Sequence, residues 1–182
     1  MKHLILTTTL FLSALLCQAQ NIQEPEYKGQ VAMVKADSTT VLLQKENGEQ
    51  KAKSSMFGAI PIPGASLLDK TKAWLTVKGI ASPNKVTAKT FSLIIRVKDN
   101  SEEPKNAFGV FKFEVKKKER RYQMADIGVL SGAKATTNFT TVSYDAKKFG
   151  TSSYLVTFNN LEGGEYGIVA GDFSSIATFS VE

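Results

Sequence analysis

The sequence predicts an all-β protein built as an antiparallel β-sandwich. Nearly every apolar segment is short, is rich in β-branched or aromatic residues and alternates with polar residues, which is the pattern of a strand with one buried face. These segments recur at intervals of about ten residues, as in sandwiches and barrels. Turn-forming runs such as ADS, ENG, KDNSEEP and NLEGG separate them.

Residues 1–19 are expected to be a secretory signal peptide and to lie outside the fold. A short positive start is followed by an apolar stretch from Leu4 to Leu16 and then by small side chains. This stretch is shorter than the roughly 20 apolar residues of a membrane anchor. We therefore expect cleavage between Ala19 and Gln20. Attachment of a lipid at Cys17 is the alternative, which the bulky residue before the cysteine disfavours.

Residues 20–26 are predicted to be a flexible tail, and residues 27–182 a single β-sandwich domain without internal repeats. At most one short helix is expected, over residues 67–72, because Ser66 and Asp69 have the spacing of a capping box. The predicted strands are 27–34, 39–46, 50–57, 72–79, 90–98, 107–115, 120–126, 138–145, 152–158, 164–170 and 175–182.

Two of these strands carry a more detailed prediction. In residues 90–98 one face is expected to be buried and the other wet. The buried set is Phe91, Leu93, Ile95 and Val97, and the wet set is Ser92, Arg96 and Lys98. In residues 107–115 the alternation changes phase, which predicts a β-bulge close to Gly109.

Removal of the signal peptide would remove His3 and Cys17, the only histidine and cysteine of the sequence. Without imidazole or thiol, a Ser-His-Asp triad, a Cys-His pair, an N/S zinc site and histidine ligation of haem are all excluded. We therefore predict no catalytic residue, no metal ligand and no cofactor. The net charge of +6 is modest and indicates solubility or loose association with anionic lipid or glycan.

The run VKKKERRY at residues 115–122 is the most basic stretch of the chain. It lies where two predicted strands meet, so its expected role is to keep an exposed hairpin soluble. The candidate binding residues, if the hairpin instead contacts an anionic glycan or lipid headgroup, are Lys116, Lys117, Lys118, Arg120 and Arg121. Nucleic acid is not expected as a partner, because export removes it and few aromatic side chains are interleaved.

Carboxylates alone could still perform acid-base chemistry, since a glycosidase needs only two of them. Glu102 and Glu103 are adjacent, but they lie in a polar turn together with Asp99. Calcium binding by these three residues is a second possibility, yet the run lacks the repeated acidic spacing of a calcium loop. Glu114 is expected on a wet strand face.

The segment FGAIPIPG, residues 57–64, is apolar, and its prolines exclude a central strand. It is expected either to cover one end of the core as a strap or to form an exposed loop that contacts a partner. Ser38, in the tripeptide DST, is a candidate O-glycosylation acceptor at a predicted hairpin tip. Asn138 begins an NFT tripeptide, which fits the N-glycosylation pattern, but such a tripeptide is common by chance.

The stretch LEGGEYGIV narrows the choice of fold among β-sandwiches and barrels. Leu161, Gly164 and Tyr166 resemble the L-x-x-G-x-Y corner of immunoglobulin-like and fibronectin-like sandwiches, in which the tyrosine hydroxyl bonds back to the chain. Ile168 stands where antibody domains have a cysteine, which fits a version without a disulfide. The resemblance implies an immunoglobulin-like sandwich with extra N-terminal strands and with residues 175–182 as its last strand.

The chain from residue 24 to residue 182 also resembles an uncharacterised family of exported proteins from Gram-negative bacteria. The resemblance is carried by EPEYKGQV, ADSTTVLLQKE, FGAIPIPG, IIRVKDN, KKKERRYQM, LSGAK, YDAKKFG and GEYGI, in that order. It implies a periplasmic or surface-attached β-sandwich and brings no activity with it.

Three functions remain open from the sequence. The first is an exported, non-enzymatic β-sandwich that binds a protein or glycan of the cell envelope. The second is a peripheral envelope protein whose basic hairpin engages anionic glycan or lipid. The third is a hydrolase that uses carboxylates only.

Overall fold

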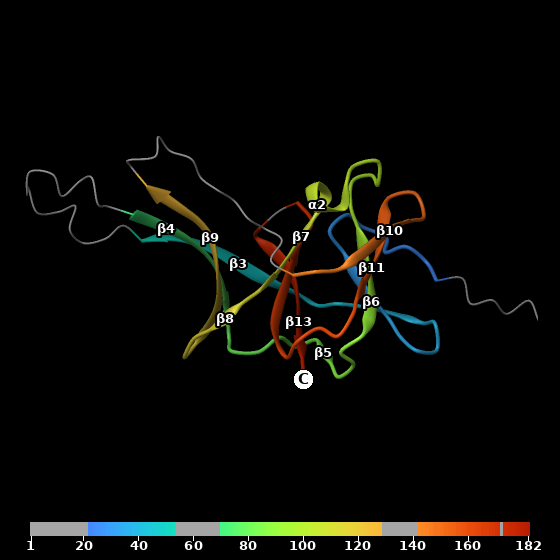
Figure 1. Cartoon of the computed structure of the whole chain (residues 1–182), viewed down its shortest axis with the longest axis horizontal. Helices are drawn as coiled ribbons and strands as arrows, with labels where there is room; N and C mark the ends of the chain where they lie inside the picture. Colours follow the sequence, from blue (N-terminus) through green and yellow to red (C-terminus); the bar gives the residue numbers. More distant parts are fainter. Residues whose placement is uncertain (1–21, 54–69, 129–141, 172) are drawn as a thin grey trace, which may run out of the picture.

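The chain folds into two β-sheets, and the computed structural model describes residues 22–53, 70–128, 142–171 and 173–182 (Figure 1). The first sheet has five strands in the order β10-β11-β6-β1-β2. They are β1 (Val31–Val34), β2 (Thr40–Leu42), β6 (Phe91–Arg96), β10 (Asp145–Phe149) and β11 (Ser153–Phe158). Every pair in this sheet is antiparallel.

The second sheet follows the order β7-β12-β13-β3-β4-β9-β8. Its strands are β3 (Lys45–Lys53), β4 (Lys70–Lys78), β7 (Gly109–Lys112), β8 (Glu114–Val115), β9 (Glu119–Gly128), β12 (Gly164–Val169) and β13 (Ser175–Val181), and the short β5 (Lys85–Val86) pairs in parallel with β13. The consecutive strands β7 and β8 pair with β12 and β9 respectively. The first and last strands of this sheet, β7 and β8, are therefore consecutive in the chain, and the sheet curls round on itself. We call this barrel-like arrangement the closed sheet.

Two apolar cores hold the fold together. The larger core lies between the two sheets and includes Val31, Leu43, Phe91, Leu93, Ile95, Phe108, Val110, Tyr154, Val156, Phe158, Tyr166, Ile168 and Phe179. The smaller core lies inside the closed sheet and consists of Leu75, Val77, Phe111, Phe113, Tyr122, Met124, Val169 and Ile176. Each fully buried side chain of this size contributes about 1.5–3 kcal/mol, so both cores are substantial.

Strand β7 explains the change of phase in residues 107–115. Its pairing with β12 is regular from Gly109 to Lys112, so the predicted bulge near Gly109 is wrong. The alternation breaks because both faces of β7 are buried: Val110 belongs to the larger core and Phe111 to the smaller one. The irregularity of the closed sheet lies elsewhere, between Ala73 and Trp74 in the pairing of β4 with β9.

The predicted fold class is confirmed: the described chain is nearly all β, with antiparallel sheets and one short helix, as expected of an all-β sandwich. Strands β6 and β11 lie in one sheet and β7, β12 and β13 in the other. At the start of β12, the Tyr166 hydroxyl donates a hydrogen bond to the carbonyl of Glu162 at 2.7 Å, as the corner motif predicts. Gly164 has a φ of +153°, which favours glycine. Leu161 packs against the larger core.

Strand β6 buries more than its expected face. Phe91, Leu93, Ile95 and Val97 are buried in the larger core, as predicted. On the opposite face, however, Ile94 is also fully buried. It lies between Ala32 of β1 and Leu155 of β11 in the register of the sheet, so neighbouring side chains cover it. The expectation of a wet second face is therefore wrong at its centre.

Several predicted elements need correction. The strand expected over 39–46 is divided between β2 and β3, because the chain passes there from one sheet to the other. Of the described part of the strand expected over 138–145, only Asp145 is in a strand, as the first residue of β10. The short β5 has no counterpart among the predicted strands.

The helix predicted over 67–72 is also wrong where it can be compared. Lys70 to Lys72 belong to β4 and pair with β9, and residues 67–69 lie outside the described residues. A four-residue helix, α2 (Pro104–Ala107), instead follows the SEEP turn, with Pro104 in its first turn. Among the described residues, no helix has the length and apolar character needed to span a bilayer.

The tail predicted to be flexible is held against the body in its described part. One oxygen of Glu24 lies 3.0 Å from Arg96, and the same carboxylate accepts backbone N–H bonds from Thr151 and Ser152 at 3.1 and 2.9 Å. Charged hydrogen bonds of this kind are stronger than neutral ones. Glu24 therefore fixes the start of the domain to β6 and to the turn between β10 and β11.

Candidate functional site

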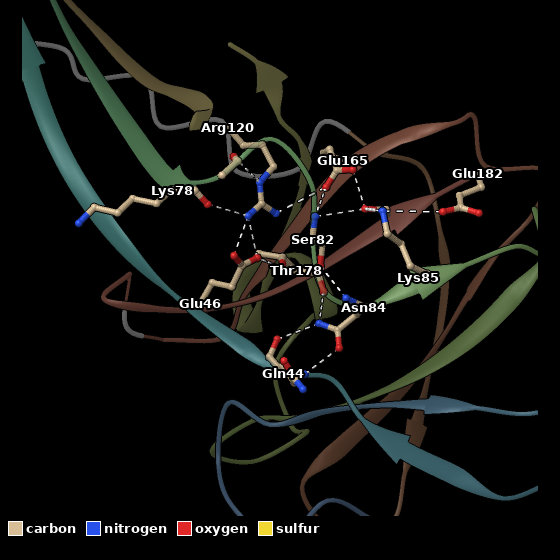
Figure 2. A network of polar contacts seen from close by, with 12 residues as sticks. Gln44, Glu46, Lys78, Ser82, Asn84, Lys85, Arg120, Glu165, Thr178 and Glu182 are labelled. Carbon is tan, nitrogen blue, oxygen red and sulfur yellow. Dashed lines mark hydrogen bonds and ion pairs between the residues drawn. The ribbon is translucent and has the colours of Figure 1, made fainter. Parts of the chain in front are cut away.

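A polar cluster closes one end of the interior of the closed sheet (Figure 2). Its centre is the side chain of Arg120 on β9, which is fully buried. Register places Arg120 beside Val77, on the same face as the smaller core. Two carboxylates approach it, Glu46 from β3 and Glu165 from β12. We call these three residues, together with Ser82, Thr178 and Ser180, the Arg120 cluster.

Glu46 is the principal partner of Arg120. The Nη2 group of Arg120 lies 2.7 and 2.8 Å from the two oxygens of Glu46 and 3.2 Å from the carbonyl of Lys78. Its Nε donates to the carbonyl of Gly79 at 3.2 Å. The guanidinium also lies 5.8 Å from the centre of the Phe113 ring, within cation–π range. The Arg120 side chain thus connects its own strand, β9, to β3 and to the end of β4.

Glu165 occupies the opposite side of the cluster. Its Oε2 lies 3.5 Å from Nη1 of Arg120 and accepts the backbone N–H of Ser82 at 2.7 Å. Its Oε1 accepts the hydroxyl of Ser180 at 2.5 Å. Both oxygens are therefore engaged by protein donors.

The loop between β4 and β5 is bonded to the same cluster. The hydroxyls of Ser82 and Thr178 lie 2.8 Å apart, and Thr178 donates to Glu46. Asn84 donates to the carbonyls of Thr178 and Gln44 at 2.7 and 2.9 Å and accepts the N–H of Gln44 at 2.9 Å. Figure 2 shows these side chains meeting from β3, β13 and the loop, so the cluster fastens the loop across the end of the closed sheet.

This geometry suits a structural role better than acid-base chemistry. A buried arginine is costly unless its charge is paired, and the two carboxylates supply that pairing. The carboxylates are in turn occupied by Arg120 and hydroxyl donors, which leaves little acceptor capacity for a substrate proton. Glu46 remains one-fifth exposed. It forms one wall of an open pocket of about 310 Å³ with Lys45, Asn47, Glu49, Val77 and Lys78.

The basic hairpin forms as predicted, with residues 116–118 between β8 and β9, but its charges are not all available. Arg120 points into the interior, so the expectation that it lies on the surface is wrong. Glu114 engages two others: it accepts from Arg121 at 2.7 Å and forms an ion pair with Lys116. The hydrogen bond from Arg121, reinforced by Lys116, lowers the pKa of Glu114. Lys117 and Lys118 are exposed at the tip.

A second polar surface lies on the outer face of strands β3, β4 and β9, opposite the smaller core. Trp74, the only tryptophan of the chain, is on this face because Leu75 and Val77 point inward. The guanidinium of Arg121 lies 4.2 Å from the centre of its ring. Lys51 is paired across the sheet with Trp74 and bonds Glu119 at 3.0 Å, and this bond raises the pKa of Lys51.

The remaining predicted residues are dispersed. Ser38 is exposed at the tip of the β1–β2 hairpin with a φ of +63°, next to Asp37, whose carboxylate accepts two hydrogen bonds from Thr39. Asp99 accepts hydrogen bonds from Ser101, and these lower its pKa. Ala19, Gln20, Asn138 and residues 57–64 lie outside the described residues.

The side chains of Asp99, Glu102 and Glu103 in the acidic turn are not grouped as metal ligands would be. Among residues 22–53, 70–128, 142–171 and 173–182, no three histidine, cysteine, aspartate or glutamate side chains are grouped as metal ligands would be. Glu102 and Glu103 are exposed on the approach to α2. Calcium binding by this turn is therefore not supported by its geometry.

The sequence analysis predicted neither the Arg120 cluster nor the polar surface around Trp74 on the outer face of β3, β4 and β9. Strand alternation in KAWLTVKG places Trp74 opposite Leu75 and Val77, so the outward position of the tryptophan could have been found. No local signal marks the cluster, because Glu46, Arg120 and Glu165 come from three distant strands. No family model, curated protein or solved structure matches the chain.

Proposed function

We propose that this chain is an exported, non-enzymatic binding protein of the bacterial cell envelope. The signal-like N-terminus and the resemblance to exported Gram-negative proteins support export. The all-β sandwich and its resemblance to immunoglobulin-like domains at the Tyr166 corner support binding, and the fold by itself does not define a function.

The observation that carries the proposal is the way the interior acids are used. Glu46 and Glu165 converge on a common point, as the acids of a hydrolase would, but Arg120 lies between them and hydroxyl donors bond both. Polar groups that a partner could contact include those on the outer face of the closed sheet and on the hairpin. This arrangement supports contact with a partner rather than turnover of a substrate.

The test begins with production of the full chain in a Gram-negative host. Fractionation and intact mass should place a product that begins at Gln20 in the periplasm or at the outer membrane. A lipid-modified product at Cys17 would retain export and change only the mode of attachment. The purified protein should sediment with isolated envelopes in a saturable manner. A product that keeps Met1 in the cytoplasm, or glycoside hydrolysis that is lost in Glu46→Gln, would contradict the proposal.

A second candidate is a peripheral protein whose hairpin engages anionic lipid headgroups. Its specific support is the combination of exposed Lys117 and Lys118 with Val115, which is 47% exposed beside them. A basic segment with an adjacent apolar side chain can associate with anionic bilayers. Flotation with phosphatidylglycerol vesicles, decreasing as salt is raised and lost in a K117Q/K118Q variant, would favour this candidate.

A further inference from the structure

We infer that the outer face of the closed sheet binds an extended anionic polysaccharide of the uronic acid type. This inference rests on the proposed function and names the ligand class of the binding surface. The surface is defined by Glu49 and Lys51 on β3, Trp74 and Lys78 on β4, and Glu119 and Arg121 on β9.

The position of Trp74 is the first observation. Tryptophan is usually placed in a core, but here Ala73, Leu75 and Val77 of the same strand supply the core contacts. Trp74 instead lies in the middle of the outer face, with Lys51 beside it on β3. The Arg121 guanidinium lies over the Trp74 ring, and the two planar groups together give a rigid platform on which a sugar ring and its carboxylate can pack.

The charge of this surface is the second observation. Arg121 is held against the Trp74 ring and bonded to Glu114. Lys51 is held by Glu119, and Lys78 is 90% exposed at the end of β4. On the surface itself, Lys51, Lys78 and Arg121 stand against Glu49 and Glu119. The adjoining hairpin adds Lys116, Lys117 and Lys118 against Glu114. This excess complements a polymer that carries regularly spaced carboxylates.

The open pocket beside Glu46 is the third observation, and it sets the length of the ligand. The pocket shares Glu49 and Lys78 with the outer face and adds Lys45 and Asn47. Lys78 is four positions along the strand from Trp74, a distance of about 13 Å at the usual rise of a β-strand. A ligand that contacts both the ring and the pocket must therefore be an extended oligomer rather than a single sugar.

The same geometry argues against a lipid surface as the occupant. The ring of Trp74 is half-buried within a sheet face and is bordered by charged side chains. A bilayer would favour an exposed aromatic or apolar side chain at a protruding tip, where it could enter the interface. An extended, hydrated polymer can lie along the strands without displacing the ion pairs of the face.

Because Trp74 is the only tryptophan, its fluorescence reports on this surface alone. The processed protein should be titrated with oligogalacturonates of increasing length, with neutral galacto-oligosaccharides of the same lengths as controls. We expect a change in Trp74 emission with the charged oligomers only, growing with length and weakened by salt. Isothermal titration calorimetry of a Trp74→Phe variant should show affinity reduced about tenfold at unchanged thermal stability.

A matched pair of variants distinguishes binding at this surface from a general effect of net positive charge. Lys51→Gln and Lys147→Gln remove the same charge, but Lys147 is exposed on β10 of the other sheet. We expect Lys51→Gln to weaken binding several-fold and Lys147→Gln to leave it unchanged. Equal effects of the two variants, or phosphatidylglycerol vesicles binding where oligogalacturonates do not, would overturn the inference. Normal export with no oligosaccharide binding would overturn this ligand while leaving the proposed function in place.

Discussion

Val110 and Phe111 are neighbours in the chain, yet their side chains are buried in different cores on opposite faces of β7. Strand β7 is therefore a wall shared by the sandwich and by the closed sheet. Its partner β12 has the same character, since Ile168 belongs to the larger core and Val169 to the smaller one. The two cores share a structural wall, so we expect them to unfold together.

Substitution of Gly167 tests how tightly the smaller core is packed. A Cβ atom at this position would lie 2.7 Å from the Phe111 ring and 2.8 Å from the Phe113 ring. We expect Gly167→Ala to lower the free energy of unfolding by about 1–3 kcal/mol, because two buried rings would have to move. Urea denaturation measures this. Gly163→Ala is the control, because its nearest neighbour would be a carbonyl oxygen at 3.5 Å, and an equal loss in both variants would contradict the packing described.

Loss of the buried Arg120 side chain should lower the free energy of unfolding more than loss of its partly exposed neighbour Arg121. Arg120→Met leaves Glu46 and Glu165 without their cation, and we expect a loss of about 3–5 kcal/mol in the free energy of unfolding. Arg121→Met removes the same charge from the surface and should cost less than about 1 kcal/mol. Chemical denaturation of both variants gives the comparison. Similar stabilities would show that the buried ion pairs contribute no more than the exposed one.

The contacts of Glu24 predict a dependence of stability on pH. Burial alone would raise the pKa of Glu24, but the backbone bonds from Ser152 and Thr151 and the hydroxyl bonds outweigh it and lower the pKa from 4.5 to about 2. The folded state therefore favours the charged carboxylate. Its contribution, up to about 3 kcal/mol, is fully present above pH 4.5 and is lost as the pH falls towards 2.

Glu24→Gln should accordingly be less stable than the native chain at pH 7, and the difference should shrink as the pH is lowered from 4.5 towards 2. Denaturant titrations at a series of pH values measure it. Glu26→Gln, a change of an exposed residue in the same segment, serves as the control. A difference that stays constant down to pH 2 would show that the charge of Glu24 is not the source of the effect.

The hydroxyl of Tyr166 offers a narrower test of the corner. Tyr166→Phe keeps the ring, which stacks on Phe179 with centroids 5.2 Å apart, and removes the hydroxyl with its bonds to Glu162 and Lys112. We expect a loss of about 1 kcal/mol in the free energy of unfolding. The matching change of Tyr27, whose side chain is largely exposed, should have no measurable effect. A thermal shift equal to that of Tyr27→Phe would remove the proposed role of the hydroxyl.

The sequence predicted elements well where one face of a strand is buried, because alternation then follows the fold directly. It failed at β7, where burial on both faces resembles a bulge, and at 39–46, where two sheets share a single alternating run. Strand β10 was missed because its sequence, DAKKF, lies at a sheet edge and contributes little to either core. Alternation of apolar and polar residues predicts a strand only when one face of that strand is buried. In these three segments both faces, neither face or two different sheets are involved, so the alternation is misleading.

The candidate sites show the same limit. Arg120 and Arg121 are adjacent in a basic run and were predicted to share one environment, but the strand directs one inward and the other outward. Strand alternation could have predicted this difference. Tyr122 is largely apolar and lies two positions after Arg120, so the two side chains are expected on the same, inward face. The partners of Arg120 come from β3 and β12, and pairings over such distances in the chain carry no local signal.

The bond between Glu24 and Thr151 also bears on the order in which the molecule is made. The two residues are 127 positions apart, so the fastening of the domain's start must wait until the turn after β10 has left the ribosome. Until then Glu24 lacks these backbone partners, and the start of the domain cannot be held in its final place. This contact therefore forms late in synthesis and joins an early part of the chain to one near its end.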